Sequence, residues 1–224
     1  MSTKIAIVTG AAGGMGKAFV HRLIADGCRV AGFDISQAGL DELAKEHGAD
    51  FLAICVDLTD SDAVTASFAE VVAAFGGLDI LVNNAGTCFM SEFPNIPADE
   101  LKQQMALNFE TAFHCCQNAV PLMLEREGVK KIINISSNGA YNFDVFDPPP
   151  YRASKAALDT LTKDLARRYA TDKICVNSIA PAMTETPLFG VLSDEVLAGA
   201  IAQMPHGHAM QPDQIAGWVS FLSG

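Results

Sequence analysis

The sequence has no long hydrophobic run and carries little positive charge. No stretch of about 18 apolar residues is free of charged or turn-forming residues, so we expect no transmembrane helix. The first residues, a lysine followed by a short apolar run and glycines, do not resemble a signal peptide. Only 15 lysines and arginines oppose 26 acidic residues, and the net charge of −11 argues against nucleic acid and anionic membranes as partners.

Cysteine patterns typical of metal or redox sites are also absent. The chain has 6 cysteines, but no Cys-x-x-Cys and no Cys/His cluster at metal-ligand spacing, so we expect no metal site. Cys55 and Cys175 lie in apolar, strand-like runs, where a thiol is expected to pack as a small hydrophobic group. A reducing, cytoplasmic compartment is the simplest expectation.

The chain lacks repeats, low-complexity tracts and linkers, so we predict a single domain over residues 1–224. Half of the residues are apolar, which is enough for a large core. Apolar, strand-like runs alternate with amphipathic helical stretches, which predicts an α/β fold with a Rossmann-type, doubly wound parallel sheet. We expect strands at residues 5–9, 29–33, 51–56, 80–83, 131–136 and 174–179, and helices at residues 16–26, 36–46, 60–75, 99–126 and 151–169.

A glycine-rich turn joins the first strand to the first helix. Glycine permits a tight turn and lets the backbone approach a phosphate closely, and a helix N-terminus offers free N–H groups to a pyrophosphate. The alternative is an ordinary strand-to-helix turn. The candidate cofactor-binding residues of this turn are Gly10, Gly13, Gly14, Met15 and Gly16.

Two aspartates end the second and third strands and indicate which dinucleotide binds. A carboxylate at Asp34 can accept hydrogen bonds from both hydroxyls of an adenine ribose and would repel a 2′-phosphate. Its neighbour is Ile35 rather than a cation, so we predict NAD, with NADP less favoured. Asp57, followed by Leu58, could reach the adenine amino group. Helix or turn capping is the alternative for both aspartates.

The catalytic candidates are Tyr151 and Lys155, four residues apart, with Ser137 fourteen residues before the tyrosine. On a helix, positions i and i+4 share a face, so the phenol and the ammonium would enter one site. A free phenol has a pKa of about 10, and a nearby cation should lower it towards neutral pH, as suits an acid/base catalyst. Alone, this spacing is weak evidence, because it arises more often on an ordinary helix surface with a partly buried tyrosine.

Together, these motifs resemble the short-chain dehydrogenase/reductase family over nearly the whole chain. The resemblance rests on Thr9-Gly10 to Gly14-x-Gly16, Asp57, Asn83-Asn84-Ala85-Gly86, Asn108, Ile133-Asn134-Ile135-Ser136-Ser137, Tyr151 to Lys155, and Asn177-Ser178-Ile179-Ala180-Pro181 leading to Thr186-Pro187-Leu188.

The resemblance implies a role for each matched residue. Tyr151 would be the acid in reduction and the base in oxidation, and Lys155 would lower its pKa and hold the nicotinamide ribose. Ser137 would bind the substrate carbonyl oxygen, and Asn108 would support a water relay to Lys155. The further cofactor contacts that it implies are Asp57, Leu58, Asn84, Ala85, Gly86, Pro181, Thr184 and Thr186.

The chain departs from the family pattern in three places. Ala182 follows Pro181 where the family usually has glycine, which adds a Cβ beside the nicotinamide. Three prolines follow Asp147 and stiffen the approach to Tyr151. Family members also continue into a last strand, which we expect to be missing here. Residues 183–212 are irregular and proline-containing, and we expect them to form a loop-helix segment over the site.

The expected substrate wall is mostly apolar and aromatic, although any one of its members could simply be core. It favours a hydrophobic ketone or secondary alcohol, and the absence of Arg and Lys from residues 137–150 disfavours a small free acid. The wall residues are Cys88, Asn138, Tyr141, Phe143, Phe146, Met183 and Leu188.

The leading function is therefore an NAD-dependent oxidoreductase that interconverts a hydrophobic secondary alcohol and a ketone. The first alternative is a 3-oxoacyl-thioester reductase, whose acyl carrier protein or CoA could lie on Arg126, Lys130, Lys131 or Arg152. The second is a dinucleotide-binding sensor without catalysis. Apolar residues on several faces of the helices expected at 99–126 and 151–169 predict a homo-oligomer, most simply a tetramer.

Overall fold

The computed structural model describes residues 3–142, 147–187, 190 and 194–224. The strands are β1 (Ile5–Thr9), β2 (Arg29–Asp34), β3 (Phe51–Cys55), β4 (Ile80–Asn83), β5 (Lys130–Ile135) and β6 (Ile174–Ile179). The helices are α1 (Gly14–Ala25), α2 (Gln37–His47), α3 (Ser61–Phe75), α4 (Ala98–Met105), α5 (Thr111–Leu124), α6 (Pro149–Arg168), α7 (Asp194–Ala202) and α8 (Pro212–Ser223).

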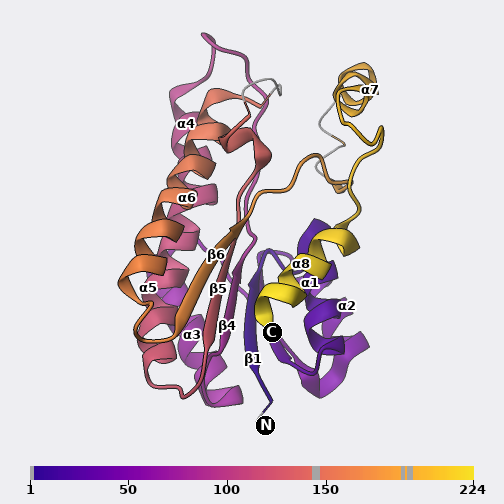
Figure 1. Ribbon diagram of the computed structural model, residues 1–224. Helices are drawn as coiled ribbons and strands as arrows, with labels where there is room; N and C mark the ends of the chain where they lie inside the picture. Colours follow the sequence, from indigo (N-terminus) through magenta and orange to yellow (C-terminus); the bar gives the residue numbers. More distant parts are fainter. Residues whose placement is uncertain (1–2, 143–146, 188–189, 191–193) are drawn as a thin grey trace.

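The six strands form one parallel sheet in the order β3-β2-β1-β4-β5-β6. Helices α3, α4, α5 and α6 lie on one side of the sheet and α1, α2 and α8 on the other (Figure 1). Side chains of β1 alternate between the two layers, with Ile5 and Ile7 in one core and Ala6 and Val8 in the other. The strand order reverses between β1 and β4, and ligands of such sheets bind at the carboxyl ends of the strands at this point.

The predicted fold class is confirmed, and the helices differ from the prediction in two places. The helix expected at 99–126 is divided by a π-helical turn, Ala106–Glu110, between α4 and α5. The helix α8 was not expected. Pro212 looked like the end of an irregular segment, but it occupies the first turn of a helix, where the missing N–H costs nothing. A capping box between Gln211 and Gln214 fixes this start.

The expectation that Cys55 and Cys175 are buried is wrong, because both are exposed. They lie on β3 and β6, the two edge strands of the sheet. In β6, Ile174 and Val176 are buried, whereas Cys175 and Asn177 are exposed. An edge strand that is covered on one face leaves alternate side chains in solvent, which an apolar run in the sequence does not reveal.

The apolar residues used to predict an oligomer face the core more than expected. Leu158 is buried, and Leu161 and Leu165 pack against the buried cluster that α3 and α5 share with the sheet. Phe113 and Leu124 of α5 remain exposed. The homotetramer stays a prediction, and the surface that favours it is the outer face of α5. No helix in the described part of the chain is both long and apolar enough to cross a membrane.

One mostly buried carboxylate fastens the amino-terminal edge of the sheet. Asp79 accepts hydrogen bonds from Nε and Nη2 of Arg126 at 3.0 and 2.8 Å. Its Oδ2 also accepts from the backbone N–H of Ile5 at 2.9 Å. Asp79 therefore ties the start of β1 to the segment that follows α5.

We expect Asp79→Ala to lower the free energy of unfolding by about 3 kcal/mol, because it leaves a partly buried guanidinium and an amide without their acceptor. Urea denaturation followed by circular dichroism measures this change. Asp164→Ala is the matched control, since it removes an exposed ion pair with Arg168 at 3.3 Å and should cost less than about 1 kcal/mol. Equal losses in the two variants would contradict the importance of Asp79.

Candidate active site

The glycine-rich turn lies between β1 and α1, and two of its glycines, Gly10 and Gly16, are packed too closely for a side chain. Gly10 and Gly14 have positive φ values of 62° and 51°, which glycine adopts without strain. A Cβ on Gly16 would overlap the carbonyl oxygen of Gly10. The turn is fixed to β4 because Thr9 Oγ1 accepts from the N–H groups of Asn84 and Ala85, at 2.9 and 3.0 Å.

The start of α1 suits an anion. Gly13 is its N-cap and has no side chain to satisfy the first N–H groups, and the first turn contains no acidic residue. A Cβ on Gly13 would meet nothing within 4 Å, so the turn is open on this side. Free N–H groups and the positive end of the helix dipole therefore face open space, as binding of a pyrophosphate requires. Met15, beside them, packs partly against the core.

Asp34 contacts the glycine-rich turn directly. Its Oδ2 accepts from the backbone N–H of Ala12, and its Oδ1 from that of Ser36, both at 2.9 Å. Each carboxylate oxygen has a second lone pair, so both remain available to a ribose. Ile35 beside it is 76% exposed. An exposed aliphatic side chain next to a fixed carboxylate suits an adenosine group.

The end of β3 is organised by the second aspartate. Asp57 Oδ1 accepts from the N–H and the hydroxyl of Thr59, at 2.9 and 2.7 Å. These hydrogen bonds lower the pKa of Asp57, so it is charged at neutral pH. The side chain of Leu58 is buried in the core, which leaves only its backbone for a ligand. Asp57 therefore stabilises the turn after β3 through Thr59, which is the alternative that the sequence left open.

The catalytic candidates come together at the carboxyl end of β5. Tyr151 and Lys155 lie on α6, with the Lys155 Nζ 5.9 Å from the centre of the Tyr151 ring. The ammonium donates to the carbonyl oxygen of Ile135 at 2.9 Å. Ser137 follows β5 and is hydrogen-bonded to Tyr151. A Cβ on Gly86 would lie 3.4 Å from the Lys155 Nζ, so the loop after β4 also borders this cluster.

Burial controls the titration of these side chains. It raises the pKa of the Tyr151 phenol above its usual value, although the hydrogen bond with Ser137 acts in the opposite direction. Burial also lowers the pKa of Lys155 to about 8, against the attraction of Asp159. The expectation that Lys155 brings the phenol towards neutral pH is wrong for these side chains alone, because losing hydration costs the phenolate more than the neighbouring groups return.

Asn108 lies in the π-helical turn and joins two elements of the site. Its Oδ1 accepts from the N–H of Thr87 at 2.8 Å, and its Nδ2 donates to Thr87 O at 2.9 Å and to Ser154 Oγ at 3.1 Å. The π turn displaces the backbone at this position from regular α-helical geometry, a feature that is frequent at functional sites. Asn108 is therefore held between the loop after β4 and the first turns of α6.

Three polar residues of the site were missed in the sequence. Gln104 fixes the loop after β4 by accepting from Phe89 N at 2.9 Å and donating to Thr87 O at 2.6 Å. Asp159 is buried beneath Lys155 and accepts from the hydroxyls of Ser136 and Ser178, at 2.9 and 2.6 Å. Its position, four residues after Lys155 on the same helix, was the available signal.

Asp147 is the third missed residue, and it brings negative charge to the site. A Cβ on Gly139 would overlap its carboxylate, and its charge raises the pKa values of both Tyr151 and Cys88. Its own pKa is raised by burial and lowered by Arg152. Arg152 also donates to the carbonyl oxygen of Asp147 at 2.7 Å. In the sequence, the only visible feature of this aspartate is that a run of three prolines follows it.

The expected substrate wall is only partly described. Cys88 lies near Asp147 and Lys155, and burial raises its pKa to about 12. Asn138 N donates to the carbonyl oxygen of Pro181 at 2.9 Å. Tyr141 is exposed, and a hydrogen bond with Asp159 raises its pKa to about 12. The wall residues Phe143, Phe146 and Leu188 lie outside the described residues.

The segment after β6 approaches the glycine-rich turn. A Cβ on Gly14 would lie 3.6 Å from Thr186, which puts Thr186 beside the phosphate site. Thr184 is buried, and its hydroxyl donates to the carbonyl oxygen of Ala182 at 3.0 Å. Met183 accepts from Met210 N at 2.8 Å, which fastens this segment to the residues before α8. Figure 1 shows α7 beyond the carboxyl ends of the strands.

Comparison with known proteins agrees with this geometry. Residues 4–196 match the family described as short chain dehydrogenase. A 3alpha-hydroxysteroid dehydrogenase of Mediterraneibacter gnavus is 34% identical over 231 residues, covering 100% of this chain and 90% of the relative. A 3-oxoacyl-(acyl-carrier-protein) reductase of Staphylococcus aureus is 37% identical over 232 residues, covering 99% of this chain and 91% of the relative.

The fold is also that of solved members of the family. A 3-ketoacyl-(acyl-carrier-protein) reductase from Brucella melitensis, complexed with NADH, superposes with a TM-score of 0.91 at 27% identity, covering 99% of this chain and 90% of that one. A dehydrogenase/reductase from Sinorhizobium meliloti has a TM-score of 0.90 at 33% identity, covering 100% of this chain and 89% of that one. The chain belongs to the short-chain dehydrogenase family, whose members are oxidoreductases that act on CH–OH groups with a nicotinamide dinucleotide.

Proposed function

We propose that the protein is an NAD-dependent oxidoreductase that interconverts a hydrophobic secondary alcohol and its ketone. The observation that carries this proposal is the grouping of Ser137, Tyr151 and Lys155 at the carboxyl end of β5. The glycine-rich turn lies at the same edge of the sheet and is fastened to the neighbouring β4. A proton donor and a dinucleotide cradle at one edge suit hydride transfer to or from a carbon–oxygen bond.

Each side chain then has a distinct task. The dinucleotide, when bound, supplies or accepts the hydride. Tyr151 gives a proton to the carbonyl oxygen in reduction and removes it from the alcohol in oxidation, while Ser137 holds that oxygen by a hydrogen bond. Lys155 places positive charge beneath the phenol and binds ribose hydroxyls. Asn108 positions the first turns of α6 through Ser154 and supports proton transfer to Lys155.

The charges around the site favour a neutral substrate. Asp147 lies near Tyr151 and Cys88 and would repel a carboxylate. The 3-oxoacyl-thioester alternative is supported by the names of relatives such as the reductase of Staphylococcus aureus. Three of the four cations proposed to hold its carrier are engaged elsewhere. Arg126 forms an ion pair with Asp79 at 2.8 Å. Lys130 donates to three backbone carbonyls at the start of β5, and Arg152 binds carbonyls of the loop before α6.

The sensor alternative is not favoured, because the chain retains all four proposed catalytic side chains and belongs to a family of oxidoreductases. Comparing the reduction of aryl and alicyclic ketones with that of acetoacetyl thioesters, each with NADH, distinguishes the two enzymatic hypotheses. We expect higher kcat/KM for the neutral ketones. A clear preference for thioesters would instead support the 3-oxoacyl-thioester reductase.

We expect Tyr151→Phe to fold normally and bind the dinucleotide, because the ring that fills the site is retained. Turnover should fall by at least about 10²-fold, the lower range for loss of an acid/base group. Steady-state kinetics measure the loss, and fluorescence titration with NADH checks binding. Turnover close to that of the unchanged protein would disprove the role of Tyr151.

The pH dependence of alcohol oxidation should respond to Asp147. Its negative charge raises the pKa of Tyr151, so Asp147→Asn should lower that pKa and shift the rising limb of the pH–rate profile to lower pH. Asp164→Asn is the control, because it removes the same charge from the exposed face of α6 and should leave the profile in place. A shift to higher pH in Asp147→Asn would contradict the electrostatic contact.

Cofactor choice should depend on Asp34 and Ile35. We expect much higher kcat/KM with NAD than with NADP, because the Asp34 carboxylate repels a 2′-phosphate. Ile35→Arg is the cleanest test, since Ile35 is exposed whereas Asp34 also holds Ala12 and Ser36. This single change should raise kcat/KM with NADP, and the double variant with Asp34→Ala should narrow or invert the ratio. Preference of the unchanged protein for NADPH would show that Asp34 was misinterpreted.

A further inference from the structure

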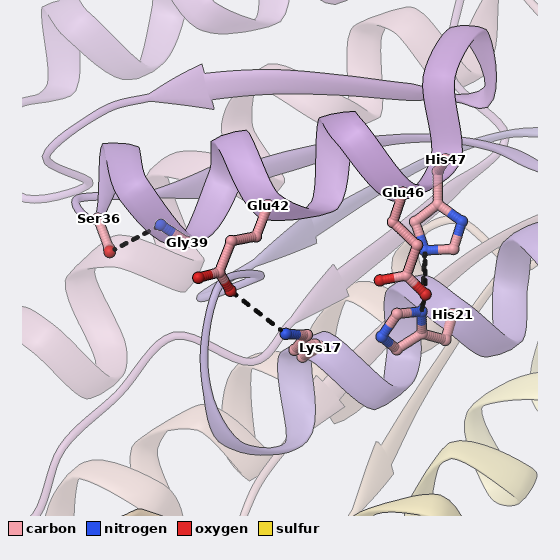
Figure 2. A network of polar contacts seen from close by, with 7 residues as sticks. All are labelled: Lys17, His21, Ser36, Gly39, Glu42, Glu46 and His47. Carbon is pink, nitrogen blue, oxygen red and sulfur yellow. Dashed lines mark hydrogen bonds and ion pairs between the residues drawn. The ribbon is translucent and has the colours of Figure 1, made fainter.

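Three side chains of α1 and α2 converge outside the active site. His21 comes from the middle of α1, and Glu46 and His47 come from the last turn of α2 (Figure 2). The Nδ1 of His21 lies 2.8 Å from the Nε2 of His47 and 3.4 Å from the Oε1 of Glu46. The same Nε2 and Oε1 are 4.0 Å apart. These three distances join the same three atoms, which therefore form one triangle of potential metal ligands.

The fold holds this triangle in place. One turn earlier on both helices, Lys17 and Glu42 form an ion pair at 3.6 Å (Figure 2). Positions 17 and 21 of α1 therefore face positions 42 and 46 of α2 in register. The side chain of His47 is only 13% exposed and that of His21 is 35% exposed, so burial limits their rotamers. The ring of His47 also lies against Phe51.

The donor set is that of a borderline transition metal. Zinc binds imidazole nitrogens and carboxylate oxygens at about 2.0–2.2 Å in a tetrahedron, which separates its ligand atoms by roughly 3.4 Å. One edge of the observed triangle is shorter than this, one is equal and one is longer. Magnesium and calcium prefer sets made only of oxygen, and two imidazoles do not suit them.

We propose that His21, Glu46 and His47 form a binding site for a divalent transition-metal ion of the zinc type, with the fourth position open to water. In the metal-free protein the two rings share one hydrogen bond. When the ion binds, the ring that donated this hydrogen bond carries its proton on its other, outward nitrogen, so that both facing nitrogens present lone pairs to the metal. Within the described residues, this is the group of three His, Cys, Asp or Glu side chains whose ligand atoms lie within 4.8 Å of one another. The expectation of no metal site came from local spacing, and His21 is far from Glu46 in sequence.

A metal here would clamp together the two helices that carry the dinucleotide contacts. α1 begins in the phosphate-binding turn, and α2 begins just after Asp34. A Cβ on Gly39 would lie 2.7 Å from the Cβ of Ala12, so α2 already packs closely on that turn. Fixing the middle of α1 to the last turn of α2 would favour this packed arrangement. We infer a structural ion that stabilises the cofactor half, outside the catalytic chemistry.

The test is isothermal titration of the chelator-treated, full-length protein with ZnCl₂, together with thermal unfolding. The background variant His206→Ala/His208→Ala removes a stacked histidine pair that could bind zinc separately. We expect one zinc ion per chain and a higher melting temperature with zinc. His21→Ala and His47→Ala should each weaken binding by more than about 100-fold, beyond the usual loss for an outer-shell partner alone, and should abolish the thermal shift.

Glu42→Gln is the matched control, because it breaks the ion pair with Lys17 on the same helices and leaves all three ligands. Its zinc affinity should stay within about twofold of the unchanged protein, which is within the usual context dependence of a surface ion pair. Circular dichroism checks folding, and His21→Gln replaces His21→Ala if the latter unfolds. Zinc affinity that His21→Ala or His21→Gln leaves unchanged would overturn the proposal. So would equal losses in the ligand variants and Glu42→Gln, or failure of the background variant to bind zinc.

Discussion

The burial of the Lys155 ammonium is the constraint on which the arrangement of the site depends. A shift of its pKa to about 8 corresponds to about 3 kcal/mol of preference for the neutral amine relative to water. The surrounding protein has to limit this cost. Ile135 O accepts directly from the ammonium, and Asp159 supplies the nearest opposing charge. Asp159 is held in turn by Ser136 and Ser178, at the ends of β5 and β6.

This constraint explains why so many polar side chains lie behind the site. Asn83 donates to Asn134, which donates to Thr162, and the Thr162 hydroxyl donates to Leu158 O, each at 2.8 to 2.9 Å. The chain of hydrogen bonds joins β4 and β5 to α6, the helix that carries Lys155. Buried polar groups of this kind specify one packing, because any shift of α6 leaves them without partners. The Asn83 Oδ1, which has no partner among the described residues, shows that even this arrangement is not complete.

The sequence was sufficient for features that depend on local pattern. Apolar periodicity located all six strands of the sheet, and glycine spacing located the turn at β1. It was insufficient where burial depends on the rest of the fold. Cys55 and Cys175 have strand-like neighbours, but only the order of the strands reveals that both lie at an edge. Asp147 similarly has no local mark of function, and it reaches Tyr151 only because Arg152 holds the loop before α6 against Gly139.

Asp34 shows that two roles that look mutually exclusive in the sequence can be compatible in the structure. Asp34 could cap a helix or bind a ribose, and its carboxylate holds Ser36 N and Ala12 N while retaining lone pairs for a ligand. The two tasks reinforce one another, because the backbone contacts fix the carboxylate before any dinucleotide arrives. A side chain that is already ordered loses less conformational entropy on binding. A structural role for a site residue is therefore no argument against a functional one, and in Asp34 the first makes the second more effective.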